Sequence, residues 1–443
     1  MTTAPSTSTE NPPADTLSPS STHTTSVGVD MGDSASPEGN KVAVPEGSAS
    51  TTHTSAPLLG SLNNTRVGDQ SESEHDLTTE DGVRSYLAGT PFASTRVETL
   101  SGGSANYVYR LWLESPLEGE IQTAVLKHTK PYVREFKHVA FTDERQVFEV
   151  EALKRVASWV PKDLLVQVPR VHKFDHGAHA IIMDDAGEGS VTLKEFMKQG
   201  GPTVDMAVQI GKGIGEFLGS VHAWGTANRA ELEVFQGHTQ GKVLGARYYY
   251  GRLANFFLGK SGEPKLEDPP LLVDDATLAV LKEVGEETSQ ALQSANDHFV
   301  QGDFWPGNML VALDKEGQLK RILVVDWEMA RIGIPGVEVG QFAAEIYFCG
   351  RFHEDVCKET SKAVLDNFFA AYSAKFDVTD ELARRALVHF GTHLAVVGPT
   401  VGWGPKDISR EVALEGAKII AGGHNAELAL LKESAIGGLL NGR

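Results

Sequence analysis

The stretch His298–Asp326, HFVQGDFWPGNMLVALDKEGQLKRILVVD, constrains the fold more than any other part of the chain. Asp303 precedes Asn308 by five residues, and the Trp-Pro-Gly sequence between them predicts a rigid turn. Two β-runs, MLVAL and RILVV, flank a turn at Lys315–Gly317 and predict a hairpin. Because the second run ends just before Asp326, the hairpin brings that carboxyl next to Asn308.

These residue types suit phosphoryl transfer from ATP. That reaction needs a proton acceptor, metal ligands, a cation on the inner phosphates and a loop of backbone N–H groups over them. In a kinase catalytic loop, an Asp spaced like Asp303 accepts the hydroxyl proton, and an Asn spaced like Asn308 binds the metal. A carboxylate at position 326 completes a pair of oxygen ligands for Mg²⁺. The spacing alone also fits a Gly/Pro loop with capping acids, and the β-run before Asp326 favours the kinase interpretation.

Residues 77–185 show mostly strand patterns. A short helix comes first, capped by Thr79 and ended by Gly89. Strands follow on both sides of the sequence SGGSAN, and a third strand ends on Lys127. One helix begins near Asp143, and two more strands complete a small β-rich lobe. The expected buried face of that helix consists of Val147, Val150, Leu153 and Val156.

The pattern becomes helical after Ala186. Residues 231–297 form a mixed, largely helical insert, and most of the remainder is helical. The expected fold class is therefore α+β and bilobal, with a nucleotide-binding N-lobe at 77–185 and a helical C-lobe at 186–443. One long helix in the C-lobe carries small residues that predict the close approach of another helix: Gly211, Gly213, Gly215 and Gly219.

Residues 1–76 are rich in Ser, Thr and Pro and poor in apolar side chains, so we expect a disordered tail. A passive extension is favoured over a phosphorylatable regulatory tail. The first 80 residues hold 11 acidic and 2 basic side chains, about half of the net charge of −19. This acidic balance argues against nucleic acid and anionic membranes as partners.

The chain is expected to be cytoplasmic. Cys349 and Cys357 are its only cysteines, which is too few for a secreted disulfide framework. The N-terminus has neither the basic region nor the apolar region of a signal peptide. No apolar run approaches the roughly 18 residues of a membrane span.

Lys127 is the candidate cation for the inner phosphates, since it ends a strand in the sequence AVLK. A glutamate from the next helix is needed to hold it, and Glu149 and Glu151 are both available. The candidate phosphate cover precedes the lysine strand, although a plain hairpin turn fits it equally well; its residues are Gly102, Gly103, Ser104 and Asn106. The backbone of Met183–Asp185 is a candidate hinge that pairs with an adenine edge, or else a solvated linker.

These motifs carry a family resemblance. QGDFWPGNMLV and VVDWEMA, together with LSGGSANYVYRL, AVLK, FEVEAL and GEFLGSVHAWG, resemble the aminoglycoside phosphotransferase/choline kinase-like family over residues 77–443. That family shares the protein-kinase fold. The resemblance implies ATP-dependent transfer to a small-molecule alcohol, with Asp303 as base and with Asn308 and Asp326 on Mg²⁺. It also implies that Lys127 contacts the α- and β-phosphates and is held by Glu151, which the E-A-L context favours over Glu149. Choline, methylthioribose, homoserine and aminoglycosides are substrates of relatives.

The chain departs from the family pattern at two bracing positions. Gln301 stands where the family usually has His, and Glu338 where it has Asp, so we expect the catalytic loop to be braced differently. A non-catalytic nucleotide-binding or interaction module is the alternative that these departures suggest. The protein-kinase motifs H-R-D and A-P-E are absent and D-F-G is replaced by D-W-E, which argues against a protein substrate.

Three further features are open at this level. Glu328 either caps a turn or touches a metal, and the turn is favoured. His222 is expected to be a packed histidine at a helix end. Tyr248–Tyr250 are expected to pack in the insert, with an aromatic wall for a cation as the alternative. Neither the acceptor nor the oligomeric state can be read from the sequence.

Overall fold

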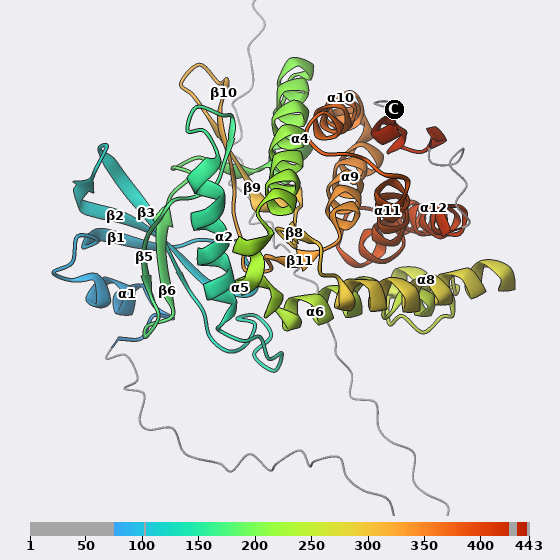
Figure 1. The fold of residues 1–443 in the computed structure, drawn as a ribbon, viewed down its shortest axis with the longest axis horizontal. Helices are drawn as coiled ribbons and strands as arrows, with labels where there is room; N and C mark the ends of the chain where they lie inside the picture. Colours follow the sequence, from blue (N-terminus) through green and yellow to red (C-terminus); the bar gives the residue numbers. More distant parts are fainter. Residues whose placement is uncertain (1–74, 102, 425–431, 441–443) are drawn as a thin grey trace, which may run out of the picture.

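The computed structural model describes residues 75–101, 103–424 and 432–440. The predicted tail up to residue 74, and Gly102, lie outside the described residues. The described chain forms two lobes (Figure 1). The N-terminal lobe is built on a five-stranded antiparallel sheet in the order β1-β2-β3-β6-β5. Its strands are β1 (Ser94–Thr99), β2 (Tyr107–Leu117), β3 (Ile121–His128), β5 (Val171–Asp175) and β6 (Ala180–Asp184).

Alternation along the strands gives this sheet two apolar faces. Ala124 and Leu126 of β3 belong to a core shared with helix α1 (Glu80–Leu87), whereas Val125 belongs to the main core shared with helix α2 (Arg145–Trp159). The predicted cap of α1 is confirmed, because the Thr79 hydroxyl accepts a hydrogen bond from the Gly82 N–H at 3.1 Å. The buried face of α2 is close to the prediction and includes Phe148, Val150, Leu153 and Val156, whereas Val147 is only half-buried.

The C-terminal lobe packs long helices against one another. They are α4 (Val204–Ala227), α9 (Pro335–Phe352), α10 (Glu354–Ser373), α11 (Asp380–Thr400) and α12 (Lys406–His424). Glycines on α4 allow α10 to approach: a Cβ added at Gly211 or at Gly215 would lie 2.3 Å from a backbone oxygen of α10. The close helix contact predicted from this glycine pattern is confirmed.

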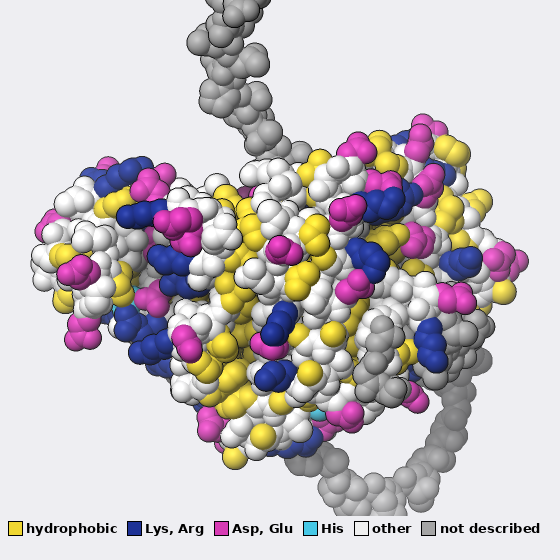
Figure 2. Space-filling view, turned by 90° about the horizontal axis from the view of Figure 1, so that it is seen from above, with side chains coloured by type: hydrophobic (Ala, Val, Ile, Leu, Met, Phe, Trp, Pro, Cys, Tyr) yellow, Lys and Arg dark blue, Asp and Glu magenta, His cyan; other side chains and the backbone are white. Residues whose placement is uncertain are grey.

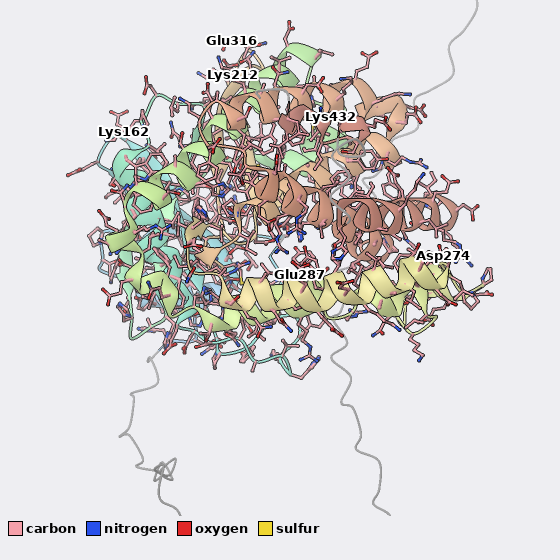
Figure 3. All side chains as sticks on the ribbon, turned by 45° about the vertical axis from the view of Figure 1, so that its right-hand side comes forward. Lys162, Lys212, Asp274, Glu287, Glu316 and Lys432 are labelled. Carbon is pink, nitrogen blue, oxygen red and sulfur yellow. The ribbon has the colours of Figure 1, made fainter. Side chains whose placement is uncertain are left out.

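The insert adds a second, smaller core to this lobe. Its elements are η1 (Arg229–Leu232), α5 (Glu233–Gln236), α6 (Thr239–Tyr249), η2 (Leu253–Phe257), α7 (Pro264–Glu267) and α8 (Asp275–Ser294). Tyr250, Phe256 and Phe257 are buried there. Helix α8 is tied to α11 by Glu287, which accepts a hydrogen bond from Arg385 at 2.9 Å; Figure 3 labels Glu287 on α8.

Short strands between the lobes carry the stretch His298–Asp326, which is called the central stretch from here on. A four-stranded sheet has the order β4-β10-β9-β7, and β8 pairs with β11. The bounds are β4 (Val166–Gln167), β7 (Val191–Thr192), β8 (His298–Val300), β9 (Met309–Leu313), β10 (Leu319–Val324) and β11 (Arg331–Gly333), with the short helices α3 (Leu193–Lys198), η3 (Pro306–Asn308) and η4 (Gly437–Leu440). The predicted hairpin is confirmed, since Met309 pairs with Val324 and the Val325 N–H donates to the Asn308 carbonyl at 2.9 Å.

A small β-rich lobe followed by a large helical lobe is the arrangement expected from the sequence, and that fold class is confirmed. Acidic and basic side chains are scattered among apolar ones on the face shown in Figure 2. Among the residues described, no helix combines the length and the apolar character needed to cross a membrane.

Candidate active site

Asp303 is held from three sides. Its Oδ1 accepts a hydrogen bond from Gln341 Nε2 on α9 at 2.9 Å. Its Oδ2 accepts bonds from Asn308 Nδ2 at 3.0 Å and from Trp305 Nε1 at 3.2 Å. Desolvation, together with the charge of Asp326, raises the pKa of Asp303 to about 6, although the three donors oppose the rise. The carboxylate is therefore oriented, and it is more basic than an ordinary aspartate.

The predicted hairpin places Asn308 and Asp326 at the ends of two paired strands. The Asn308 amide nitrogen donates to Asp303 at both its carbonyl and its carboxylate, so its amide oxygen is the end left for a cation. Asp326 has a φ of +60°, an uncommon backbone conformation for a residue other than glycine. Its side chain is 34 % exposed, the most open of the carboxylates around Lys127.

Lys127 crosses from the N-lobe to the central stretch. Its Nζ lies 2.6 Å from Asp326 Oδ1, 2.7 Å from Glu149 Oε2 and 3.8 Å from Glu328 Oε2. Burial disfavours the charged amine, but the Asp326 and Glu149 carboxylates outweigh it and raise the pKa of Lys127. Lys127 of the N-lobe therefore lies next to Asp326 of the hairpin, and its contact with the phosphates stays a prediction.

The assignment of Glu151 as the partner of Lys127 is wrong. Glu149 makes that ion pair and is completely buried, whereas Glu151 pairs with Arg155 on the outer side of α2. Two residues along a helix correspond to a rotation of roughly 200°, so only one of these glutamates can face the sheet. The short E-A-L context favoured Glu151, but the buried face of α2 also includes Gln146, which brings Glu149 inward.

Glu328 joins a buried network instead of capping a turn. Its Oε2 accepts hydrogen bonds from Arg145 Nε at 3.0 Å and from Asn106 Nδ2 at 2.8 Å. Arg145 also donates to Asn106 Oδ1 at 2.9 Å and to backbone carbonyls that include that of Phe141. Sequence reasoning missed Arg145; the only signal was its position one turn before Glu149 on the buried face of α2.

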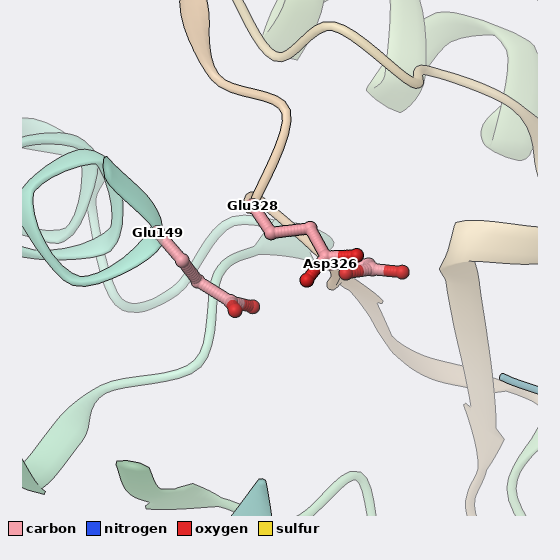
Figure 4. Close-up of side chains that lie close together, drawn as sticks. All are labelled: Glu149, Asp326 and Glu328. Carbon is pink, nitrogen blue, oxygen red and sulfur yellow. The ribbon is translucent and has the colours of Figure 1, made fainter. Parts of the chain in front are cut away.

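Three carboxylates converge at this point. Glu149, Asp326 and Glu328 have oxygens within 4.8 Å of one another, and Figure 4 shows the three side chains close together. Lys127 and Arg145 supply two positive charges against these three negative ones. Glu149 and Glu328 are committed to Lys127, Arg145 and Asn106, so Asp326, the most exposed of the three, is the carboxylate most open to a cation.

The candidate phosphate cover is only partly fixed by contacts within the protein. The side chain of Asn106 is buried and committed to Glu328 and Arg145, so it anchors the glycine-rich segment from below. The Ser104 carbonyl accepts a hydrogen bond from the Glu135 N–H at 3.0 Å, and Gly103 is exposed. Contacts of this segment with phosphates stay a prediction.

The candidate hinge follows β6. Met183 pairs with Val125 of β3, and the Asp185 carboxylate accepts two hydrogen bonds from Arg110 at 2.7 and 3.0 Å. Asp185 is therefore part of a buried ion pair and not of a solvated linker. Adenine pairing by this backbone stays a prediction.

Gln301 braces the catalytic loop in spite of replacing the usual His. Its Oε1 accepts a hydrogen bond from the Asp303 N–H at 2.7 Å, and its Nε2 donates to the Asp326 carbonyl at 2.6 Å. One fully buried amide therefore ties the expected base to the expected metal ligand.

Glu338 performs a similar task from α9. Its Oε1 accepts a hydrogen bond from the Gly302 N–H at 2.6 Å, and its Oε2 lies 2.9 Å from His222 Nε2. His222 is fully buried and also contacts the Tyr372 hydroxyl, which confirms the prediction of a packed histidine. Both departures from the family pattern thus keep contacts with the loop that holds Asp303.

Comparison with known proteins identifies the class. The family described as the phosphotransferase enzyme family matches residues 96–387, and the chain belongs to it. The resemblance inferred from the motifs is confirmed, and the chain is a kinase of small molecules. ATP as the phosphate donor follows from the family, which usually also requires a divalent metal.

The chain is similar to several named kinases. A 4-hydroxytryptamine kinase of Psilocybe cyanescens is 26 % identical over 353 residues, which cover 77 % of this chain and 92 % of the relative. The 4-hydroxytryptamine kinase of Psilocybe cubensis is 30 % identical over 297 residues, which cover 63 % of this chain and 76 % of the relative. Among solved structures, the choline kinase LicA of Streptococcus pneumoniae is 13 % identical with a TM-score of 0.41, over 76 % of this chain and 97 % of that one.

Proposed function

We propose that this protein transfers the γ-phosphoryl group of Mg·ATP to a hydroxyl group of a small molecule, with Asp303 as the proton acceptor. The observation that carries the proposal is the convergence of the two lobes. Lys127 of the N-lobe contacts Asp326 at 2.6 Å, and Gln301 ties Asp326 to the loop that holds Asp303. A phosphate-binding cation and a proton acceptor are thereby linked through one carboxylate.

Asn308 and Asp326 are the proposed ligands of Mg²⁺. They present an amide oxygen and a partly exposed carboxylate, which are ligand types that Mg²⁺ prefers when it retains waters and phosphate oxygens. When bound, Mg²⁺ supplies charge neutralisation on the phosphate oxygens.

The side chains of this chain have separate tasks in the proposed reaction. Lys127 binds the α- and β-phosphates, and Glu149 keeps its amine at the lobe interface. Asp303 orients the acceptor hydroxyl and takes up its proton as the phosphoryl group is transferred. With a pKa raised to about 6, Asp303 is ionised at neutral pH and remains a better base than an unperturbed aspartate.

The acceptor is proposed to lie next to Asp303, walled by the insert and the C-terminal helices. The names of two relatives specify a hydroxytryptamine, which carries a phenolic hydroxyl group and an amine. A phenolic hydroxyl is more acidic than an alkyl one, so an aspartate base of modest strength suffices for it. The absence of nucleic-acid and membrane partners, and the cytoplasmic location, stay predictions.

The test is phosphoryl transfer from γ-labelled ATP to a panel of phenolic amines, amino alcohols, sugars and aminoglycosides. Asp303→Asn keeps the shape of the side chain and removes the base, so we expect a loss of about 10² to 10⁴-fold in kcat. Glu151→Gln is the matched control, because Glu151 faces outward and should leave turnover unchanged. Equal rates for wild type and Asp303→Asn on every acceptor would remove the basis of the proposal.

A further inference from the structure

One face of α9 runs past the catalytic loop and continues beyond it. Glu338 binds the Gly302 N–H, and Gln341 binds the Asp303 carboxylate. Glu345 follows four residues later, and positions spaced by three and four residues share one face of a helix. It therefore lies about 6 Å further along the helix axis than the residue that contacts the proposed base.

Glu345 is a buried carboxylate with an incomplete set of partners. It is 3 % exposed, and its Oε1 lies 2.8 Å from His393 Nε2. Its Oε2 meets no hydrogen-bond donor anywhere in the described part of the chain, which is uncommon for a buried oxygen. Burial favours the protonated form, but Lys194 and His393 outweigh it and hold the pKa of Glu345 below its usual value.

Lys194 is the cation nearest to that oxygen, and it is not well bonded to it. Its Nζ lies 3.6 Å from Glu345 Oε2, whereas charge-assisted N–H···O bonds are about 2.7–2.9 Å long. The same amine stands 3.9 Å from the centre of the Trp403 ring and 5.1 Å from that of Trp305. Two indole faces and one carboxylate thus surround an ammonium group, which is the arrangement that aromatic cages use for cationic ligands.

The cage formed by Trp305, Trp403 and Glu345 shares a wall with the catalytic loop. Trp305 presents its face to the Lys194 amine and donates its ring N–H to Asp303 Oδ2 at 3.2 Å. A ligand ammonium in the cage would therefore be separated from the proposed base by little more than one indole ring.

We propose that this cage binds the ammonium group of the acceptor substrate, in the place that the Lys194 amine occupies in this structure. The proposal rests on the function proposed above, since it assumes that the acceptor hydroxyl lies at Asp303. The substrate class is then a small arylalkylamine whose hydroxyl and ammonium groups are about one helical turn apart. Lys194 has a flexible stem and a partly exposed side chain, so it can withdraw into solvent when a better-fitting ammonium arrives.

The test measures binding separately from phosphoryl transfer. Calorimetric titration with tryptamine, which has no hydroxyl group, is compared with titration with 3-methylindole, which has no amine. We expect the wild type to bind tryptamine at least about tenfold more tightly than 3-methylindole, and Glu345→Gln to lose that preference. Lys194→Met should bind tryptamine several-fold more tightly, because it removes the competing resident cation.

Two results would overturn the cage. One is an unchanged preference for tryptamine in folded Glu345→Gln, and the other is weaker binding of tryptamine to Lys194→Met. If Glu345→Gln does not fold, as judged by its thermal unfolding, the tryptamine affinity of Lys194→Met still tests the cage, because Lys194 is partly exposed and its replacement should be tolerated.

A parallel turnover assay with 4-hydroxytryptamine separates the two proposals. Amine binding that depends on Glu345, without phosphoryl transfer to any acceptor, would refute the proposed function and leave the cage standing. Phosphoryl transfer with an unchanged KM in Glu345→Gln would refute the cage and leave the proposed function standing.

Discussion

Replacing Glu149 by Gln tests the buried ion pair at the lobe interface most directly. Glu149 is completely buried, and its carboxylate lies 2.7 Å from Lys127 Nζ. Removing one partner of a buried pair commonly costs about 3–5 kcal/mol of the free energy of unfolding. Here Lys127 keeps Asp326 at 2.6 Å and Gln keeps a hydrogen-bond acceptor, so we expect a loss at or below about 3 kcal/mol.

The same substitution should lower activity. One charge-assisted hydrogen bond to Lys127 is worth about 1.5–3 kcal/mol. If that energy positions the amine on the inner phosphates, kcat/KM for ATP should fall roughly 10- to 100-fold. Glu151→Gln is the matched control on the same helix, and its partly exposed pair with Arg155 should change stability by no more than about 0.5 kcal/mol.

The assays are urea unfolding followed by tryptophan fluorescence, and steady-state kinetics with varied ATP. Equal behaviour of the two variants would refute the reasoning, because it would mean that burial and the short distance to Lys127 have no energetic consequence. A larger defect in Glu151→Gln would restore the assignment suggested by the short sequence context.

Three other outcomes follow from the geometry. Gly215→Val should destabilise the protein by more than about 3 kcal/mol in urea, because even a Cβ at Gly215 would lie 2.3 Å from the Phe368 carbonyl; an unaffected variant would mean that α4 and α10 are not in close contact. Burial, the main cause, lowers the pKa of His128 and His238 to about 4, below the roughly 6.5 of an unfolded chain, so stability is lost as pH falls through 6.5 toward 4. Each histidine should cost about 1.3 kcal/mol between pH 7.5 and 5.5, and His128→Gln/His238→Gln should flatten that dependence; a dependence of unchanged slope would contradict it. EDTA should abolish turnover and Mg²⁺ restore it, with Asp326→Asn requiring more Mg²⁺ than the wild type; turnover in EDTA would exclude the proposed metal requirement.

The fold was predictable where local pattern and tertiary contact agree. The glycine spacing on α4 predicted that another helix packs closely against it, and that helix is α10. The two β-runs and the turn between them predicted the hairpin, and with it the approach of Asp326 to Asn308, because strand pairing fixes register.

The errors at the site came from rotations that local sequence does not specify. Glu149 and Glu151 differ by about half a turn of one helix, and only the packing of α2 on the sheet decides which faces Lys127. Arg145 and Glu328 meet 183 positions apart in the chain, and Asn106 joins them from a third segment. Pairings between residues so far apart in the chain leave no local periodicity. The network of Arg145, Glu328 and Asn106 could therefore not be predicted from the sequence.

Helix α9 contributes both to the bracing of the catalytic loop and to the amine cage. Glu338 holds the loop backbone, Gln341 orients the Asp303 carboxylate, and Glu345 stands one turn beyond. All three side chains project from one face of the helix, so α9 fixes the position of Glu345 relative to the residues that hold the catalytic loop. A Glu at position 338 has one more methylene than the usual Asp, and it still reaches both Gly302 and His222. Glu338 and Gln301 therefore both keep their contacts with the loop that holds Asp303, which agrees with an active enzyme.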